Sequence, residues 1–225
     1  MKHLGLFIFL VAVLSSCNNK PETAVQIINK SIEFHDPQNE WNNFDATFYF
    51  ESSFSFNDSI PEEMKITIDV PNNNFTYKNI DREVEIQYLS DSCNLISEKG
   101  NCQGYSWTKN FYTYTWGLPM KLKDPNIKPL SKWNLDTINN YPCYAVYVNY
   151  EAENFTYYID QEDFQLRAFK FLKNDESGKG EIIHLEGLQE YNNLQFPEKR
   201  TWLQLNGDTI GTNKVMNIHK ILFEF

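Results

Sequence analysis

Four cysteines are the residues whose chemistry the 225-residue sequence specifies most directly. Cys93 and Cys102 flank an eight-residue segment that ends in Gly-Asn, a pair typical of tight turns, so a hairpin would bring the two sulfur atoms together. A disulfide bond there would stabilise the fold by about 3 kcal/mol, because it restricts the unfolded chain. The alternative is that Cys93, Cys102 and Cys143 are separate buried thiols. A zinc site is disfavoured, because the sequence has no Cys-x-x-Cys motif and no paired histidines.

Candidate catalytic groups are sparse. The sequence contains no nucleophile elbow, phosphate loop, dinucleotide-binding glycine pattern or zinc-protease motif. His35 lies at the end of a predicted helix, where the helix dipole favours the protonated imidazole, and this indicates a structural role. His184 and His219 occupy ordinary strand positions. We therefore expect a protein that is not an enzyme, with no catalytic residue, no cofactor and no metal.

The fourth cysteine, Cys17, ends a segment typical of exported proteins. A basic start precedes an unbroken apolar run over residues 4–14, which is too short to span a bilayer but suits an export signal. The Leu-Ser-Ser-Cys sequence that follows resembles the lipobox of bacterial lipoproteins, whose cysteine thiol accepts a diacylglyceryl group. The resemblance implies a signal peptide over residues 1–16, lipid attachment at Cys17 and a tether over residues 17–21. The alternative is an incidental cysteine after an ordinary signal peptide.

The formal net charge of −10 restricts the partners of the protein. An acidic surface repels nucleic-acid phosphates and anionic lipid headgroups, so we expect no nucleic-acid partner and a membrane attachment that depends on the lipidated Cys17. Asn18 and Asn19 follow this cysteine, so the inner-membrane retention signal of enteric bacteria is missing. We therefore expect a lipid anchor in the envelope of a Gram-negative bacterium, at the outer membrane and facing the periplasm.

Residues 44–56, FDATFYFESSFSF, alternate without a break between two sets of side chains, one of which is rich in phenylalanine. This alternation predicts one long, half-buried strand. A strand of this length spans about 43 Å, which favours a bent sheet over a flat one. Each buried ring contributes roughly 2–3 kcal/mol whether it contacts protein or an acyl chain, so energy alone does not separate a core from a pocket wall.

The remaining elements are one helix, a short helical insertion and many strands. Residues 22–36 place apolar side chains at helical spacing, with a capping threonine near the start and a proline after the end. Strand patterns follow over residues 65–70 and 80–88, and again from residue 143 onward. The aromatic segment 107–116 lacks clean alternation and predicts a short helix or an irregular lid.

This order of elements resembles the superfamily of outer-membrane lipoprotein carriers and receptors. The motifs SIEFHDPQNEW, GLPMKLKDP, YYID, GEIIHLEG and FPEKRTW are similar to those of an uncharacterised family of bacterial envelope lipoproteins with that fold. The resemblance implies a mainly antiparallel α+β fold over residues 22–225. In it, one strongly curved half-barrel sheet has an N-terminal helix and a short helical insertion covering its concave face, over an apolar cavity.

From this resemblance we expect a lipid-anchored protein that binds an apolar ligand, such as a lipid, an acyl chain or a lipoprotein. The residues expected to line the cavity are Phe44, Phe48, Phe50, Phe54, Phe56, Ile66, Ile68 and Val70, with Trp107, Tyr112 and Trp116 as a lid. The alternative is a non-catalytic interaction or scaffold lipoprotein with a filled core and no ligand. Its interface would use aromatic side chains on the convex face, such as Tyr147 and Tyr157.

Overall fold

The structure is a computed structural model. It describes residues 21, 23–54, 60–150, 153–173, 179–206 and 209–224. The predicted signal peptide, the lipid attachment at Cys17, the tether up to residue 20 and the predicted ligand contact Phe56 lie outside these residues. Within the described ranges, no helix is both long and apolar enough to cross a membrane.

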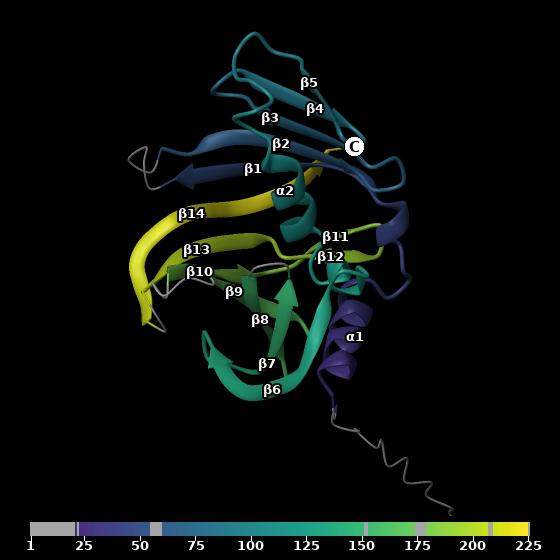
Figure 1. The fold of residues 1–225 in the computed structure, drawn as a ribbon, viewed down its shortest axis with the longest axis vertical. Helices are drawn as coiled ribbons and strands as arrows, with labels where there is room; N and C mark the ends of the chain where they lie inside the picture. Colours follow the sequence, from purple (N-terminus) through teal and green to yellow (C-terminus); the bar gives the residue numbers. More distant parts are fainter. Residues whose placement is uncertain are drawn as a thin grey trace, which may run out of the picture.

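The main element is one antiparallel sheet. Its strands are β1 (Asp45–Phe54), β2 (Glu62–Asp69), β3 (Asn74–Asn79), β4 (Val84–Leu89), β5 (Ser92–Leu95), β6 (Lys128–Ile138), β7 (Tyr141–Tyr150), β8 (Glu153–Asp160), β9 (Leu166–Lys173), β10 (Lys179–Glu186), β13 (Lys199–Asn206) and β14 (Thr209–Glu224). They pair in the order β5-β4-β3-β2-β1-β14-β13-β10-β9-β8-β7-β6. The sheet curls strongly along this order (Figure 1), which confirms the expected half-barrel.

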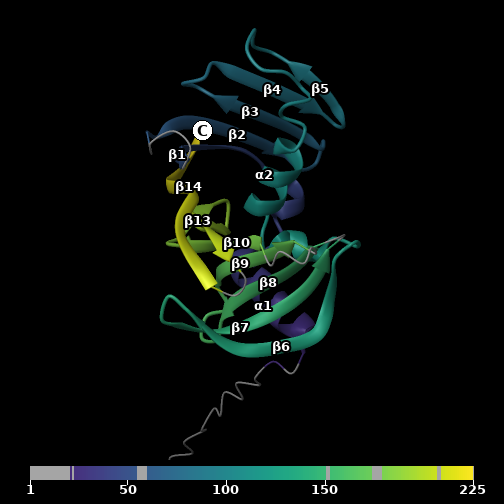
Figure 2. The same cartoon turned by 60° about the vertical axis from the view of Figure 1, so that its left-hand side comes forward.

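Helical segments and one small hairpin lie on the concave side of the sheet. They are α1 (Ala24–His35), α2 (Thr108–Trp116), the 3-10 helices η1 (Trp41–Asn43) and η3 (Met120–Lys123), and the hairpin of β11 (Gln189–Tyr191) and β12 (Leu194–Phe196). α1 contacts β6, β7, β8 and β12, whereas α2 contacts β3. Figure 2 shows α2 between the β2–β4 part of the sheet and the strands below it. The short helix predicted within residues 107–116 is therefore confirmed.

α1 begins and ends as its sequence predicts. The Thr23 hydroxyl accepts a hydrogen bond from the Gln26 amide, and the Gln26 side chain accepts one from the Thr23 amide. This reciprocal cap satisfies two amides that the first turn leaves unpaired. At the other end, the Asp36 carboxylate accepts hydrogen bonds from the amides of Glu40 and Trp41, which turns the chain into η1. The apolar stripe of the helix is buried in the core.

The strand predicted over residues 80–88 is wrong in its first half. Ile80–Glu83 form a turn, and β4 begins only at Val84. Glu83 has a φ of 55°, which no extended strand contains, and Asp81 accepts a hydrogen bond from the Glu63 amide across the turn. The alternation of apolar and charged residues continues through this turn, so periodicity alone does not reveal it. β3, which pairs with both β2 and β4, was not predicted.

Tyr157 does not lie on the convex face, where the interaction alternative needed it. Its side chain is fully buried on the concave side, with ring centroids 6.0 Å from Phe155 and 6.2 Å from Phe169. β8 carries aromatic side chains on both of its faces, and its neighbour Tyr158 belongs to a separate apolar cluster on the convex face. With apolar residues on both faces, alternation does not indicate which face is inside.

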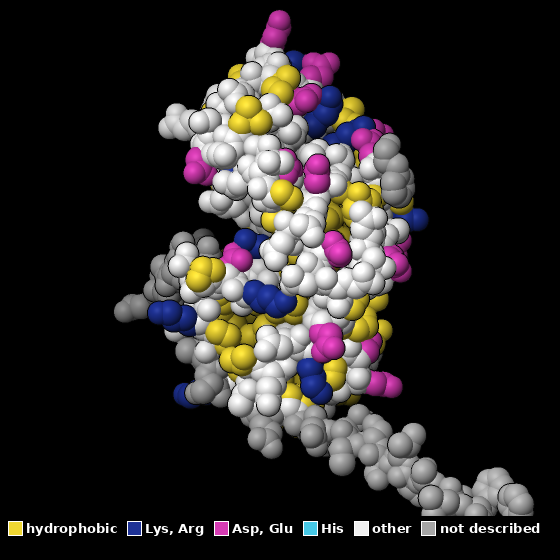
Figure 3. All heavy atoms as spheres, turned by 90° about the vertical axis from the view of Figure 1, so that its right-hand side faces the viewer, with side chains coloured by type: hydrophobic (Ala, Val, Ile, Leu, Met, Phe, Trp, Pro, Cys, Tyr) yellow, Lys and Arg dark blue, Asp and Glu magenta, His cyan; other side chains and the backbone are white. Residues whose placement is uncertain are grey.

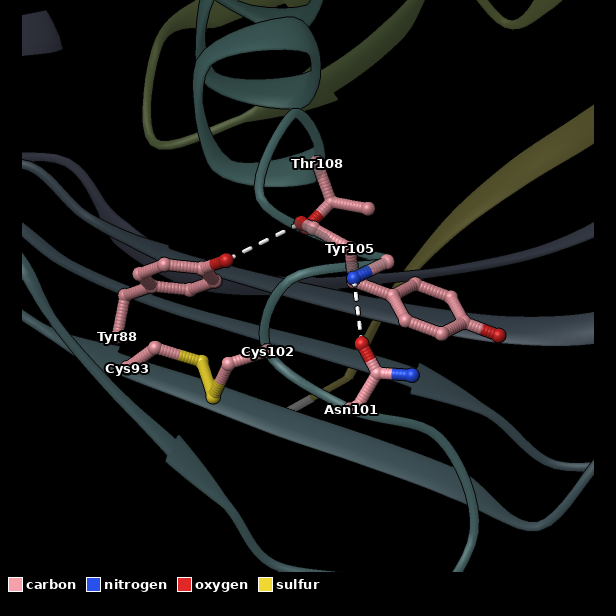
Figure 4. The surroundings of a disulfide bond; sticks show 7 residues. Tyr88, Cys93, Asn101, Cys102, Tyr105 and Thr108 are labelled. Atoms are coloured by element: carbon pink, nitrogen blue, oxygen red, sulfur yellow. Dashed lines mark hydrogen bonds between the residues drawn. A yellow bond between two sulfur atoms is a disulfide. The ribbon is translucent and has the colours of Figure 1, made fainter.

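A disulfide bond joins Cys93 on β5 to Cys102 in the segment that leads to α2 (Figure 4). Beside it, the Tyr88 hydroxyl donates a hydrogen bond to the Tyr105 carbonyl at 3.1 Å. Cys143 is a free, buried thiol, and burial raises its pKa to about 12. The disulfide bond between Cys93 and Cys102 therefore holds the segment that leads into α2 against the β4–β5 edge of the sheet.

The double substitution Cys93→Ser with Cys102→Ser is expected to lower the free energy of unfolding by roughly 2.6 kcal/mol, as loop entropy predicts for a sequence separation of 9. Urea unfolding of the oxidised protein and of the double variant measures the difference. A reducing agent is the control, because it should destabilise the parent and leave the variant unchanged. Equal unfolding midpoints of parent and variant under oxidising conditions would contradict this prediction.

Candidate ligand-binding site

The register of the sheet brings side chains from eight strands into one row on the concave face. Residues directly opposite one another in a ladder share a face of the sheet. This central row consists of Phe54, Met216, Trp202, Ile183, Phe169, Tyr157, Val146 and Trp133. Its two ends, Phe54 and Trp133, are half-buried, and the residues between them are buried. The concave face therefore carries a continuous apolar belt.

Two further rows flank the central row and differ in exposure. The outer row consists of Gln204, Glu181, Phe171, Phe155, Val148 and Pro129. The inner row consists of Arg200 and Leu185, continued by Leu166, Ile159 and Tyr144. Every residue of the inner row is buried, whereas Gln204, Glu181 and Phe171 in the outer row are half-buried. The lower part of the concave face thus has an open end at the outer row and a closed end at the inner row.

α2 places aromatic side chains against both parts of the curled sheet. Towards β1 and β3, the Tyr112 ring lies 6.3 Å from both Phe50 and Phe75. On its other flank, the Phe111 ring lies 6.2 Å from Trp202 of the central row. The hydroxyl of Tyr114 is hydrogen-bonded to that of Tyr157, and its ring lies 6.0 Å from Phe155. α2 therefore forms one wall of the lower, partly open region.

The predicted cavity wall is closed in this structure. Phe48 is 0% exposed and Phe50 is 1% exposed, and a side chain that lined a water-sized space would keep accessible surface. The Phe48 ring lies 4.8 Å from Phe223 and 6.2 Å from Trp116, and Trp116 lies 5.3 Å from Phe50. The other members are buried (Phe44, Ile66, Ile68, Tyr112), half-buried (Phe54, Val70) or exposed (Trp107). The structure therefore brings the predicted wall and two of the three predicted lid residues into direct contact.

Three further half-exposed aromatic residues surround the buried Phe155 of β8. They are Phe111 and Tyr114 on α2 and Phe171 on β9, and we use the name mouth for these four residues. The Phe155 ring connects the others, because its centroid lies 6.0 Å from Tyr114 and 5.8 Å from Phe171. Figure 3 shows hydrophobic side chains gathered on the lower half of the molecule, below a hollow in its outline. The sequence gives no signal for this group, because strands distant in sequence meet there.

His35 holds the closed end together. Its Nδ1–H donates to the Gln195 carbonyl at 2.6 Å, and its Nε2 accepts from the Leu166 amide at 3.0 Å. The ring thus ties α1 to β12 and β9 as a neutral imidazole. Burial, with a further contribution from the charges of Arg167 and Arg200, lowers its pKa from 6.5 to about 4. The structural role expected for His35 agrees with these bonds, whereas the expected protonated form is wrong, because desolvation dominates.

No group of three or more His, Cys, Asp or Glu side chains in the described part of the chain is placed to hold a metal ion. The titratable groups inside the concave region are mainly tyrosines. Burial raises the pKa of Tyr112 well above its ordinary value, so its hydroxyl is neutral. The site is therefore a surface for apolar contact, edged by a few polar groups such as Glu181 and Gln204.

Solved structures share this architecture at low sequence identity. A LolA superfamily protein from Nitrosomonas europaea aligns with a TM-score of 0.54 and 11% identity, over 89% of this chain and 91% of that chain. A putative outer membrane lipoprotein-sorting protein domain from Vibrio parahaemolyticus aligns with a TM-score of 0.49 and 11% identity, over 89% of this chain and 93% of that chain. At 11% identity, the likeness to the Nitrosomonas europaea protein shows the fold, a LolA-like open half-barrel, and not the function.

No functionally curated protein matches the sequence. The sequence model of a family of unknown function, DUF6503, matches residues 2–206, which is most of the chain. This family assignment agrees with the expected uncharacterised family of LolA-like fold. The chain is therefore a member of the DUF6503 family, built as a LolA-like half-barrel.

Proposed function

We propose that this protein binds an apolar, chain-like molecule, such as a lipid or an acyl chain, at the mouth and along the central row. The observation that carries the proposal is the half-exposed aromatic group of Phe111, Tyr114 and Phe171, which continues into a buried apolar belt. Covering apolar surface contributes about 25 cal/mol per Å², and this surface borders α2, an element separate from the sheet. The LolA-like fold supports the same conclusion by analogy.

Most of the side chains predicted from the sequence to line a cavity would contact the ligand only in a second conformation of the protein. In the present state, Tyr112 and Trp116 fill the space beside Phe48 and Phe50. Phe44, Ile66 and Ile68 would contact a ligand only after α2 moves away from β1–β3. Trp107, which is 53% exposed, and the half-buried Phe54 and Val70 lie where a ligand can reach them without that movement.

The location that we propose is the periplasmic face of the outer membrane, with attachment through a lipid on Cys17. The export signal and the lipobox-like sequence support it. The folded part begins within a few residues of Cys17, since α1 starts at Ala24. A tether this short would hold the domain against the bilayer, where acyl chains are abundant.

The filled packing around Phe48 favours the alternative, an interaction or scaffold lipoprotein without a ligand. That alternative places its interface on the convex face, so it gives no reason for aromatic side chains to remain half-exposed on the concave side, at the mouth. The two proposed functions are distinguished by whether substitutions at the mouth weaken the affinity for apolar probes.

Phe171→Asp is expected to weaken the affinity for the fluorescent apolar probe 1-N-phenylnaphthylamine by roughly tenfold or more. Oleate, added as a competitor, should displace the bound probe. A carboxylate at this point would be desolvated against the hydrocarbon chain, and tenfold corresponds to about 1.4 kcal/mol. The matched control is Leu222→Asp, because Leu222 is 43% exposed and pairs with Tyr49 on the opposite face of the sheet. Probe fluorescence and native mass spectrometry of co-purified lipid measure the effect. A parent protein that binds neither the probe nor lipid would overturn the proposed function.

A further inference from the structure

Arg200 is a buried cation without an acidic partner. It is 1% exposed, on β13 in the inner row. Its guanidinium lies 4.1 Å from the centre of the Trp116 ring, and its Nη1 donates to the Pro197 carbonyl at 2.8 Å. Nε has no hydrogen-bond partner, and among the described residues no carboxylate forms an ion pair with it. An isolated buried charge is strongly unfavourable, so its presence calls for a reason.

Among the described residues, two other buried polar groups without partners lie on the concave side with Arg200. The indole Nε1 of Trp116, the ring on which the guanidinium stacks, has no acceptor within the part of the chain that the structure describes. The hydroxyl of Ser52 on β1 also has none, and it lies in the same cross-strand line, since Ser52 and Arg200 both pair with Ile218. Within the described ranges, three buried donors without acceptors thus lie along the inner side of the apolar belt.

The C-terminus of α2 explains part of this arrangement. Trp116 is the last residue of α2, and the negative end of a helix dipole stabilises a nearby cation. Burial lowers the pKa of Arg200 to about 9, which still leaves it protonated at neutral pH. The dipole, however, supplies no acceptor for Nε. A guanidinium with Nη1 already engaged presents Nε and Nη2 as the side-on pair that binds a carboxylate through two parallel hydrogen bonds.

We propose that Arg200 binds the carboxylate of a long-chain fatty acid whose hydrocarbon chain runs outward over Trp202 to the mouth. This inference rests on the proposed function and specifies its ligand class. From Arg200 to Gln204 the strand advances roughly 13 Å, so a carboxylate at the inner row leaves a long alkyl chain crossing the central and outer rows. Because the inner row is buried, Phe111 and Trp116 must move aside as the ligand enters.

The test compares oleate with oleyl alcohol, which has the same chain and no charge, as competitors of 1-N-phenylnaphthylamine. The parent is expected to prefer oleate by at least roughly tenfold, since hydrogen bonds to a charged group are strong. Arg200→Met should bring the two affinities close to equality while the affinity for oleyl alcohol stays unchanged. Arg200→Lys, which keeps the charge but not the paired donors, should fall between them. Arg167→Met is the control, because Arg167 pairs with Asp160 and Asp163 and should leave the preference intact.

The outcomes separate this inference from the proposed function. If neither competitor displaces the probe from the parent, both fail. If both compete equally with the parent, or if Arg200→Met keeps the preference for oleate, the binding function stands and the role of Arg200 is overturned. Should Arg200→Met not fold, NMR of the parent decides, because the Arg200 Nε–H signal must shift with oleate and not with oleyl alcohol. An unshifted signal during saturating oleate binding overturns the assignment.

Discussion

Trp116→Ala is expected to lower the free energy of unfolding by about 4 kcal/mol. The Trp116 side chain is 0% exposed, and its ring lies 5.1 Å from Tyr112 and 5.3 Å from Phe50. The substitution leaves a large apolar cavity between α2 and β1. It also removes the ring on which the guanidinium of Arg200 stacks, which leaves that cation with the Pro197 carbonyl alone.

Guanidinium chloride unfolding, followed by circular dichroism, measures this effect. An unchanged slope of the unfolding free energy against denaturant concentration shows that the folded state is preserved. Trp107→Ala is the matched control. Trp107 is 53% exposed at the start of the same helix, so its removal should change stability by less than about 0.5 kcal/mol. A loss below about 2 kcal/mol for Trp116→Ala would mean that α2 is weakly held against the sheet.

The same variant tests whether the predicted cavity wall can receive a ligand. An apolar cavity created by a large-to-small substitution stays dry and binds small apolar molecules. The side of this cavity next to Phe48 and Phe50 is apolar, whereas Arg200 borders its other side. Trp116→Ala is therefore expected to take up an apolar probe next to Phe48 and Phe50 in addition to any bound at the mouth. If that extra uptake disappears with Phe48→Asp while circular dichroism shows that the double variant is still folded, the wall predicted from the sequence is a usable binding surface.

Local patterns in the sequence predicted local structure well. The cap at Thr23 and the proline two residues after His35 mark the two ends of α1. Alternation correctly indicates that Phe48 and Phe50 lie on the buried face of the sheet. These features depend on neighbours in sequence, so a single chain contains the whole signal. The half-barrel came from the resemblance of motifs to a family, not from periodicity.

The open end of the concave face was not predictable, because it depends on how strands far apart in sequence align. Phe111, Phe155 and Phe171 come from three separate segments, and each looks in sequence like an ordinary core residue. Arg200 lies within FPEKRTW, beside two exposed or half-exposed charged residues, so its burial is equally hidden. The turn at Ile80–Glu83 shows the converse, since a strand-like pattern there does not form a strand.

Acidification from pH 6.5 to pH 4 is expected to remove about 3 kcal/mol of stability through His35 alone. Its pKa is 6.5 in the unfolded chain and about 4 in the fold, because burial disfavours the imidazolium. As the pH falls, the unfolded state therefore binds the proton first. The stabilisation that depends on neutral His35 is complete above pH 6.5 and declines as the pH falls towards 4. Below that value the loss of stability reaches its maximum. Protonation of Nε2 also abolishes its hydrogen bond from the Leu166 amide.

Urea unfolding at a series of pH values checks this prediction, with His35→Gln as the test variant. The variant is expected to be less stable at pH 7, because the Leu166 amide loses its acceptor, and to show a flatter profile between pH 6.5 and 4. His184 contributes with the same sign, since burial lowers its pKa as well, so His184→Gln separates the two histidines. Equal slopes for the parent and His35→Gln would exclude His35 as the source. A slope that disappears only in His35→Gln would assign the acid-induced loss of stability to the closed end of the half-barrel, where α1 meets β9 and β12.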